Sequence, residues 1–288
     1  MQQFDLSKNN PFASYTSDFG RYFSFGAEFD KWVCDTILGA ALPIDAEKTH
    51  PYQLADIGAG SCYWSRLFLE QYKELQITAV DPSSPLILEQ ASVDIGNNED
   101  LQKRLTRHCM TAQDFSNCEP QNDISTSYDC IYFMQSAHYV GDEEFRSVFS
   151  NLAKRLKKDT GKIVIQARNM TAEWYPWAFP FEWTEQVEKA LRATAMFGRA
   201  NSYKRKFKNM DDIFRKVTLH ERHYNVRVDC ESYWERLENR WIPTFMSEEI
   251  IPPALHRAGI DSMKKRFADK NETLIGWRDK YALVTAYI

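Results

Sequence analysis

Short apolar runs bounded by turn residues recur along this chain, and amphipathic stretches separate them. The runs cover residues 52–57, 76–80, 128–134, 161–166 and 281–288. Runs of this length are typical of strands that are buried on both faces. Between two of them, Phe145, Val148 and Leu152 fall at helical spacing. The alternation predicts an α/β fold in which a doubly wound, mostly parallel sheet carries helices on both faces.

Composition limits the kinds of partner that the protein can have. The 288 residues are 43% hydrophobic, which supports a large core, and the formal net charge is −4. An acidic chain offers no overall electrostatic surface for nucleic acid or anionic membrane. The first residues lack a basic and an apolar region, and no apolar run is long enough to span a bilayer. We therefore expect a cytoplasmic protein with a small-molecule substrate. The sequence does not define its oligomeric state.

The cysteines and histidines do not form a metal site in the sequence. The six cysteines lie far apart without a C-x-x-C pair, and the six histidines are equally dispersed. This spacing is typical of free thiols in a reducing compartment and provides no ligand set for a structural metal.

Changes in pattern divide the chain into four segments. We expect an N-terminal helical arm at 1–50, a cofactor-binding core at 51–170, an inserted lid at 171–215, and closing strands and helices at 216–288. The lid is expected because an aromatic, proline-rich run and a basic stretch follow the fifth strand without a strand signal. A strand at 217–228, helices at 231–240 and 247–258, and a last strand at 281–288 are predicted to complete the domain.

The segment LADIGAGSCYW at 54–64 indicates a strand, a glycine loop and a helix. Gly58 and Gly60 allow a ligand to lie against the backbone at a helix start. The complete G-x-G-x-x-G pattern is absent because Tyr63 occupies the third glycine position, which argues against a phosphate cradle. Asp81 ends the second strand, where a carboxylate can accept both hydroxyls of a ribose. The pattern favours a ribonucleoside ligand without a phosphate.

Over residues 52–170 the sequence resembles the class I S-adenosylmethionine-dependent methyltransferases. LADIGAG is similar to the first motif of that family, VDPS to the acidic motif, TAQDF to the adenine motif, and YDCIYFMQSAHYV to the fourth-strand motif. Cys62 departs from the family pattern, which often has a third glycine there. The resemblance implies a seven-stranded Rossmann-like sheet and S-adenosyl-L-methionine as cofactor. It implies these cofactor contacts: Asp56, Gly58 and Gly60 at the methionine moiety, Asp81 and Pro82 at the ribose, Asp114 and Phe115 at the adenine, and Gln135 and Ser136 near the sulfonium.

Some of these residues have plain structural alternatives. Asp114 can instead cap a helix, and Gln135 is expected to act through its backbone. His138 follows the fourth strand, where an imidazole can serve as a general base, although a packed histidine at a helix start fits the same position.

The acceptor side is predicted from composition alone. Aromatic rings in the arm and lid can cover an acceptor or form a small satellite core. Residues 199–227 hold nine positive and three negative side chains, a difference of +6, which suits either an acidic acceptor or a solvated face. The candidate substrate-binding residues are Tyr22, Trp174, Tyr175, Trp177, Lys204 and Arg205.

The expected function is methyl transfer to a small molecule, because methyl transfer mainly needs an acceptor held in line with the donor. O-methylation of an aromatic or carboxylate-bearing metabolite is the first hypothesis. The alternatives are N-methylation of a small molecule, RNA methylation through the basic segment, and a non-catalytic, regulatory protein that binds S-adenosylmethionine.

Overall fold

A seven-stranded sheet forms the centre of the molecule. The computed structural model describes residues 26–42, 51–119, 127–168, 179–193, 199–240 and 247–288. The strands are β1 (Tyr52–Ile57), β2 (Leu75–Asp81), β3 (Leu105–Cys109), β4 (Cys130–Met134), β5 (Lys162–Arg168), β6 (Lys216–Asp229) and β7 (Leu274–Tyr287). Their order across the sheet is β3-β2-β1-β4-β5-β7-β6. The first five strands in that order are parallel, and β7 is antiparallel to both of its neighbours. The predicted doubly wound, mostly parallel sheet is confirmed.

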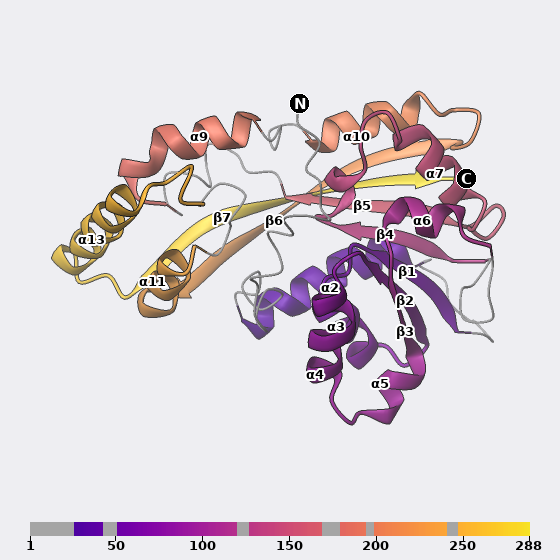
Figure 1. The fold of residues 1–288 in the computed structure, drawn as a ribbon, viewed down its shortest axis with the longest axis horizontal. Coiled ribbons are helices and arrows are strands. Elements are labelled where there is room, and N and C mark those ends of the chain that lie inside the picture. Colours follow the sequence, from indigo (N-terminus) through magenta and orange to yellow (C-terminus); the bar gives the residue numbers. More distant parts are fainter. Residues whose placement is uncertain (1–25, 43–50, 120–126, 169–178, 194–198, 241–246) are drawn as a thin grey trace.

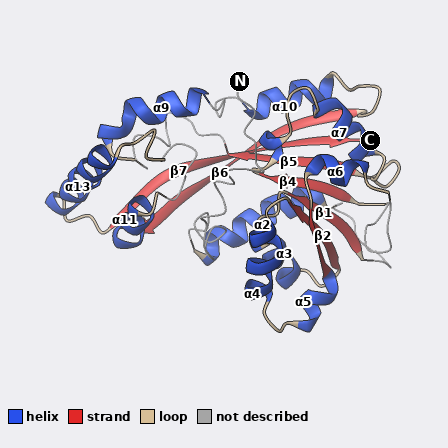
Figure 2. Ribbon diagram, viewed as in Figure 1, coloured by secondary structure: helices blue, strands red, loops and turns tan. Residues whose placement is uncertain are grey.

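Helices cover both faces of this sheet (Figures 1 and 2). They are α2 (Ala27–Ala41), α3 (Tyr63–Gln71), η1 (Pro85–Gln90), α4 (Ala91–Ile95), α5 (Glu99–Arg104), α6 (Ala112–Asn117), η2 (Ala137–Tyr139), α7 (Phe145–Ala153), η3 (Phe181–Trp183), α9 (Thr184–Ala193), α10 (Arg199–Lys208), α11 (Cys230–Glu238) and α13 (Pro253–Asp269). Buried residues of α2 and α3 share one hydrophobic cluster, and those of α6, α7 and α10 share another. None of the helices in the described part of the chain is long and apolar enough to cross a membrane.

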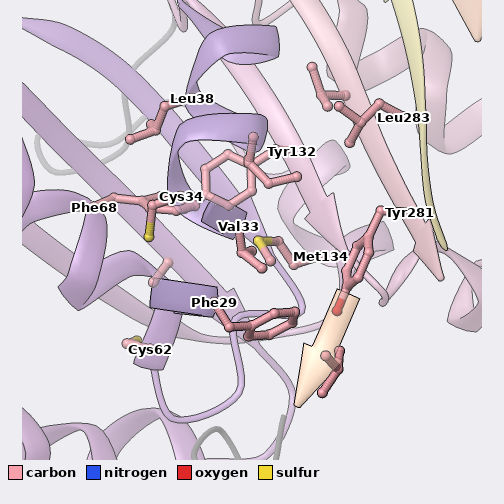
Figure 3. Packing of buried hydrophobic residues seen from close by; sticks show 14 of the residues in the cluster. Phe29, Val33, Cys34, Leu38, Cys62, Phe68, Tyr132, Met134, Tyr281 and Leu283 are labelled. Carbon is pink, nitrogen blue, oxygen red and sulfur yellow. The ribbon is translucent and has the colours of Figure 1, made fainter. Parts of the chain in front are cut away.

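The α2 helix lies directly on the sheet. Phe29, Val33 and Ile37 are buried in its inner face, as the one-turn spacing of a helix allows. Figure 3 shows Phe29 and Val33 beside Met134 of β4 and Tyr281 of β7. The described part of the expected N-terminal arm therefore belongs to the core.

The last two strands extend beyond the rest of the sheet. Residues 281–287 of β7 pair with β5, whereas residues 274–280 pair with β6 alone. The β6–β7 ribbon therefore continues past the carboxyl end of β5. Helices α9, α11 and α13 gather at its far end (Figure 1). Trp183 fixes this group, since its buried Nε1 donates to the carbonyl of Leu255 at 3.0 Å.

The described part of the expected lid contains a helix of the sheet layer. Tyr203 and Phe207 of α10 are buried against α7, and the Phe207 and Phe149 ring centroids lie 5.0 Å apart. The basic residues of α10 are therefore the outer face of a helix that covers the sheet. Within the expected lid, residues 171–178 and 194–198 lie outside the described residues. The division of the chain into four segments stays a prediction.

Three elements differ most from expectation. No strand was predicted at the position of β3. Helix α13 begins at Pro253 rather than at 247, and β7 begins at Leu274 rather than at 281. The charged residues 278–280 of β7 interrupt its apolar pattern, and only β6 pairs with residues 274–280, so the signal of a strand buried on both faces is limited to the later residues.

Gly259 tests the packing of α13 against Trp183. A Cβ atom at Gly259 would lie 2.2 Å from Trp183 Nε1 and 2.9 Å from Pro180 Cβ. We expect Gly259→Ala to lower the free energy of unfolding by about 1–3 kcal/mol, as overpacking does in a filled core, which chemical denaturation would measure.

Gly39→Ala is the matched control. Gly39 is also helical, but its added Cβ would meet no atom within 4 Å. Alanine should stabilise α2 by about 0.5–1 kcal/mol through helix propensity alone. Equal effects of the two substitutions would show that the contact with Trp183 is unimportant.

Candidate active site

The glycine loop after β1 is tied to β2 by its backbone. The N–H groups of Gly58 and Ala59 donate to the carbonyl of Val80, at 2.7 and 3.0 Å. Gly58 has φ 77° and Gly60 φ 55°, which is the left-handed region that glycine adopts without strain. A Cβ at Gly58 would lie 2.3 Å from Ser136 Cβ, whereas one at Gly60 would meet nothing within 4 Å. The loop therefore packs closely against β4 at Gly58 and borders open space at Gly60.

Asp81 closes the loop from the end of β2. One of its carboxylate oxygens accepts from the N–H of Gly60 at 2.9 Å, and the other accepts from the N–H of Ser83 at 2.8 Å. Burial raises the pKa of Asp81, and these two hydrogen bonds oppose the rise. Each oxygen retains a lone pair for another donor.

Asp56 lies beneath the loop in a buried network. Its side chain is 2% exposed, and its Oδ2 accepts from Ser65 Oγ at 2.6 Å. The Tyr132 hydroxyl lies 3.1 Å from Ser65 Oγ. Asp56 Oδ1 has no hydrogen-bond partner. Burial raises the pKa of Asp56 to about 7, against the hydrogen bonds from Ser65 and Tyr132, which lower it.

Cys62 begins α3 with a strained backbone. It has φ 61°, in the left-handed region, and is fully buried. A β-carbon is unfavourable in that conformation, which gives a physical reason for the glycine that the family pattern often has at this position.

The carboxyl end of β4 lies beside this loop. Gln135 also has a positive φ, 55°, and its N–H donates to the carbonyl of Gln166 on β5 at 3.1 Å. Ser136 Oγ donates to the carbonyl of Ile57, which joins the ends of β1 and β4. His138 follows in η2, half-buried, with its ring centroid 4.0 Å from that of Tyr139. Pro82 is exposed after Asp81.

The two residues predicted to contact adenine, Asp114 and Phe115, have different structural roles. Asp114 forms a capping box with Thr111, whose Oγ1 donates to Asp114 Oδ2 at 2.7 Å. Its role at adenine stays a prediction. Phe115 is fully buried, with its ring 6.2 Å from that of Tyr128 and the Arg155 guanidinium above it. The ring of Phe115 packs in the core, and its contact with adenine stays a prediction.

Most of the candidate substrate-binding residues lie outside the part of the chain that the structure describes. These residues are Tyr22, Trp174, Tyr175 and Trp177. On α10, Lys204 is half-buried and Arg205 is exposed. Their neighbour Lys206 pairs with Asp142 and lies 4.6 Å above the Phe145 ring.

Sequence reasoning missed three residues of this edge of the sheet. Ser65 and Tyr132 hold Asp56, and Gln166 lies beside the end of β4. A signal existed for Ser65, since it lies in the first turn of the helix that follows the glycine loop. The polar side chain of Gln166 within an apolar strand was the signal for the third residue.

The pKa of Asp56 predicts how stability depends on pH. In the unfolded chain the ordinary pKa is 3.8, and in the folded chain it is about 7. Between these values the folded protein holds a proton that the unfolded chain has released, so stability falls as pH rises from about 4 to about 7. Asp56→Asn removes this titration. Denaturation at several pH values should give a steeper decline for the wild type than for the variant, and parallel curves would contradict the prediction.

The comparisons with known proteins agree with this geometry. Residues 55–162 match a family model described as a methyltransferase domain. A search of curated proteins finds no match. Phosphoethanolamine N-methyltransferase 2 from Haemonchus contortus, solved with S-adenosyl-L-methionine, is similar in fold, with a TM-score of 0.57 and 14% identity over 99% of this chain and 60% of that one.

Two further structures extend the likeness in fold. The same Haemonchus contortus enzyme, solved with phosphomonomethylethanolamine and S-adenosylhomocysteine, has a TM-score of 0.53 and 15% identity over 97% of this chain and 58% of that one. A putative methyltransferase from an antibiotic biosynthesis pathway of Anabaena variabilis has a TM-score of 0.52 and 16% identity over 88% of this chain and 96% of that one.

The chain thus spans 60% of the length of the first of these structures. The glycine loop, the strand order and the match to the family model all indicate the same kind of domain. The resemblance found in the sequence is confirmed at the level of the domain. Residues 55–162 match a methyltransferase domain, and the chain shares the fold of the three structures.

Proposed function

We propose that the protein transfers a methyl group from S-adenosyl-L-methionine to an oxygen atom of a small molecule. The observation that carries the proposal is Asp81, whose two oxygens accept the Gly60 and Ser83 N–H groups and keep lone pairs at the open side of the loop. Nitrogen is the alternative acceptor atom, since two of the structures with a similar fold are named N-methyltransferases.

The residues at this edge fit the cofactor. Asp81 can accept the two ribose hydroxyls, and the space beside Gly60 leaves room for a ligand against the backbone. The unpartnered Asp56 Oδ1 is a buried acceptor beneath the same loop. A ligand with positive charge would favour the ionised form of Asp56.

The protein's share of the chemistry is positioning. When bound, S-adenosyl-L-methionine supplies a methyl group on a positively charged sulfur. The glycine loop and Asp81 fix the nucleoside, and the backbone at Gln135 and Ser136 forms the floor beside it. Holding the acceptor in line replaces a bimolecular encounter and accounts for much of the acceleration. His138, just past β4, takes the proton that a hydroxyl acceptor releases.

Asp81→Ala tests the cofactor assignment. The substitution removes charge-assisted hydrogen bonds, each with a value of roughly 1.5–3 kcal/mol, so affinity for S-adenosyl-L-methionine should fall by about tenfold or more. Titration calorimetry of the folded variant measures it.

Asp100→Ala is the control. Asp100 is an exposed carboxylate on α5 that pairs with Arg104 of the same helix and with Lys73 of the loop before β2. It should leave cofactor affinity unchanged. The proposal fails if the wild type does not bind S-adenosyl-L-methionine, or if Asp81→Ala binds it with full affinity.

His138→Ala tests the general base. With an acceptor found by screening, kcat should fall by roughly a hundredfold, and the affinity for S-adenosyl-L-methionine should not change. Unaltered turnover would reduce His138 to a packing role and leave positioning as the whole mechanism.

A further inference from the structure

Gln166 is a buried amide that none of the described residues satisfies. Its side chain is 1% exposed, and in the described part of the chain neither Oε1 nor Nε2 has a hydrogen-bond partner. An unsatisfied buried polar atom costs about 1–3 kcal/mol. A leucine of similar volume would avoid that cost, so the amide calls for an explanation other than stability.

The surroundings of Gln166 are apolar. Its register partners are Met134 on β4 and Leu283 on β7, and both belong to the hydrophobic cluster on the α2 face. Side chains alternate along a strand and opposite residues share a face, so Gln166 points to that same face. Figure 3 shows Met134, Leu283 and Tyr281 there, beneath Phe29 and Val33 of α2.

Gln166 also lies at the carboxyl edge of the sheet. Asp56 pairs with Tyr132, so Met134 and its partner Gln166 are level with Gly58. The Gln166 carbonyl accepts the N–H of Gln135 at the end of β4. The free amide is therefore close to the edge at which the methyl donor is proposed to bind.

Aromatic rings lie beside the place where the β6–β7 ribbon continues past β5. Tyr281 stands two residues before Leu283 on the same face of β7. Its ring centroid is 6.2 Å from that of Phe29 and 5.4 Å from that of Trp32. A ligand that approaches Gln166 from the ribbon side would lie against these rings, which suits a flat or apolar body.

We infer that Gln166 is a specificity-determining residue that hydrogen-bonds an uncharged polar group of the methyl acceptor. The inference rests on the proposed function. A primary amide offers one donor group and one acceptor group, which together match a hydroxyl or another amide. A carboxylate or phosphate at this position would lose its hydration among the apolar side chains of Met134 and Leu283. The acceptor class is therefore a neutral molecule with an aromatic or apolar body.

Gln166→Leu tests the inference, with benzamide as the neutral probe and benzoate as the charged one. Binding of each is measured by calorimetry with the protein saturated by S-adenosylhomocysteine. Wild type should bind benzamide at least about tenfold more tightly than benzoate. Gln166→Leu should lose about tenfold in benzamide affinity, which corresponds to one hydrogen bond of about 1.4 kcal/mol. Its melting temperature should equal or exceed that of the wild type, and its affinity for S-adenosylhomocysteine should stay within about twofold.

Thr218→Val is the matched control. Thr218 Oγ1 is likewise buried without a partner, but it lies on β6, two strands from Gln166. This variant should leave benzamide affinity unchanged. If Gln166→Leu does not fold, Gln166→Met keeps the unbranched shape and replaces it in the same measurements.

The inference is overturned if benzamide does not bind, if benzoate binds as tightly, or if Gln166→Leu keeps full benzamide affinity. A lower melting temperature with unchanged benzamide affinity would make the amide structural. Failure of the wild type to bind S-adenosylhomocysteine would instead overturn the proposed function. These outcomes separate the two proposals.

Discussion

The glycine loop after β1 is held from both sides, and the arrangement of the whole carboxyl edge depends on this. Val80 and Asp81 of β2 accept three N–H groups from the loop, while Ser136 after β4 donates to the carbonyl of Ile57. These bonds require β2 and β4 to flank β1, which is the strand order observed. The strand order and the shape of the loop therefore support each other. Hydrogen bonds to the flanking strands fix the backbone of the loop as a rigid surface.

Asp56 shows what this rigidity costs. Its carboxyl group is buried under the loop with one oxygen held by Ser65 and the other unpartnered. Gln166 presents the same condition on the same face of the sheet, with an amide that none of the described residues satisfies. Both groups lower stability in the free protein. Their common position at the carboxyl edge is what functional sites often show, where local rules of stability are broken for binding.

The central strands could be predicted because burial on both faces makes them apolar. β1 has the predicted bounds, and β4 and β5 lie within two residues of theirs. β3 escaped because three of its five residues are polar and it lies at an edge of the sheet. The positions of Gly58, Gly60 and Asp81 at one edge of the sheet followed from the strand pattern, and their roles at the cofactor stay predictions. The burial of Phe115 did not follow, because a motif does not show whether an aromatic ring faces the core. The sequence held weak signals for Ser65 and Gln166, but the contact of Ser65 with Asp56 and Tyr132 requires the fold, which brings β1, β4 and α3 together.

The connection from β6 to β7 lies apart from the cofactor loop in the chain. Helices α11 and α13 lie between the two strands in the sequence. The ribbon pairs with β5 through residues 281–287, and Tyr224 of β6 packs against Phe29 and Trp32 of α2. Insertions or exchanges within this connection need not alter the register of β1, β2 and β4. A chimaera that receives another protein's β6–β7 connection would keep its own nucleoside edge. Divergence within this connection would therefore leave the backbone of the loop after β1 unchanged.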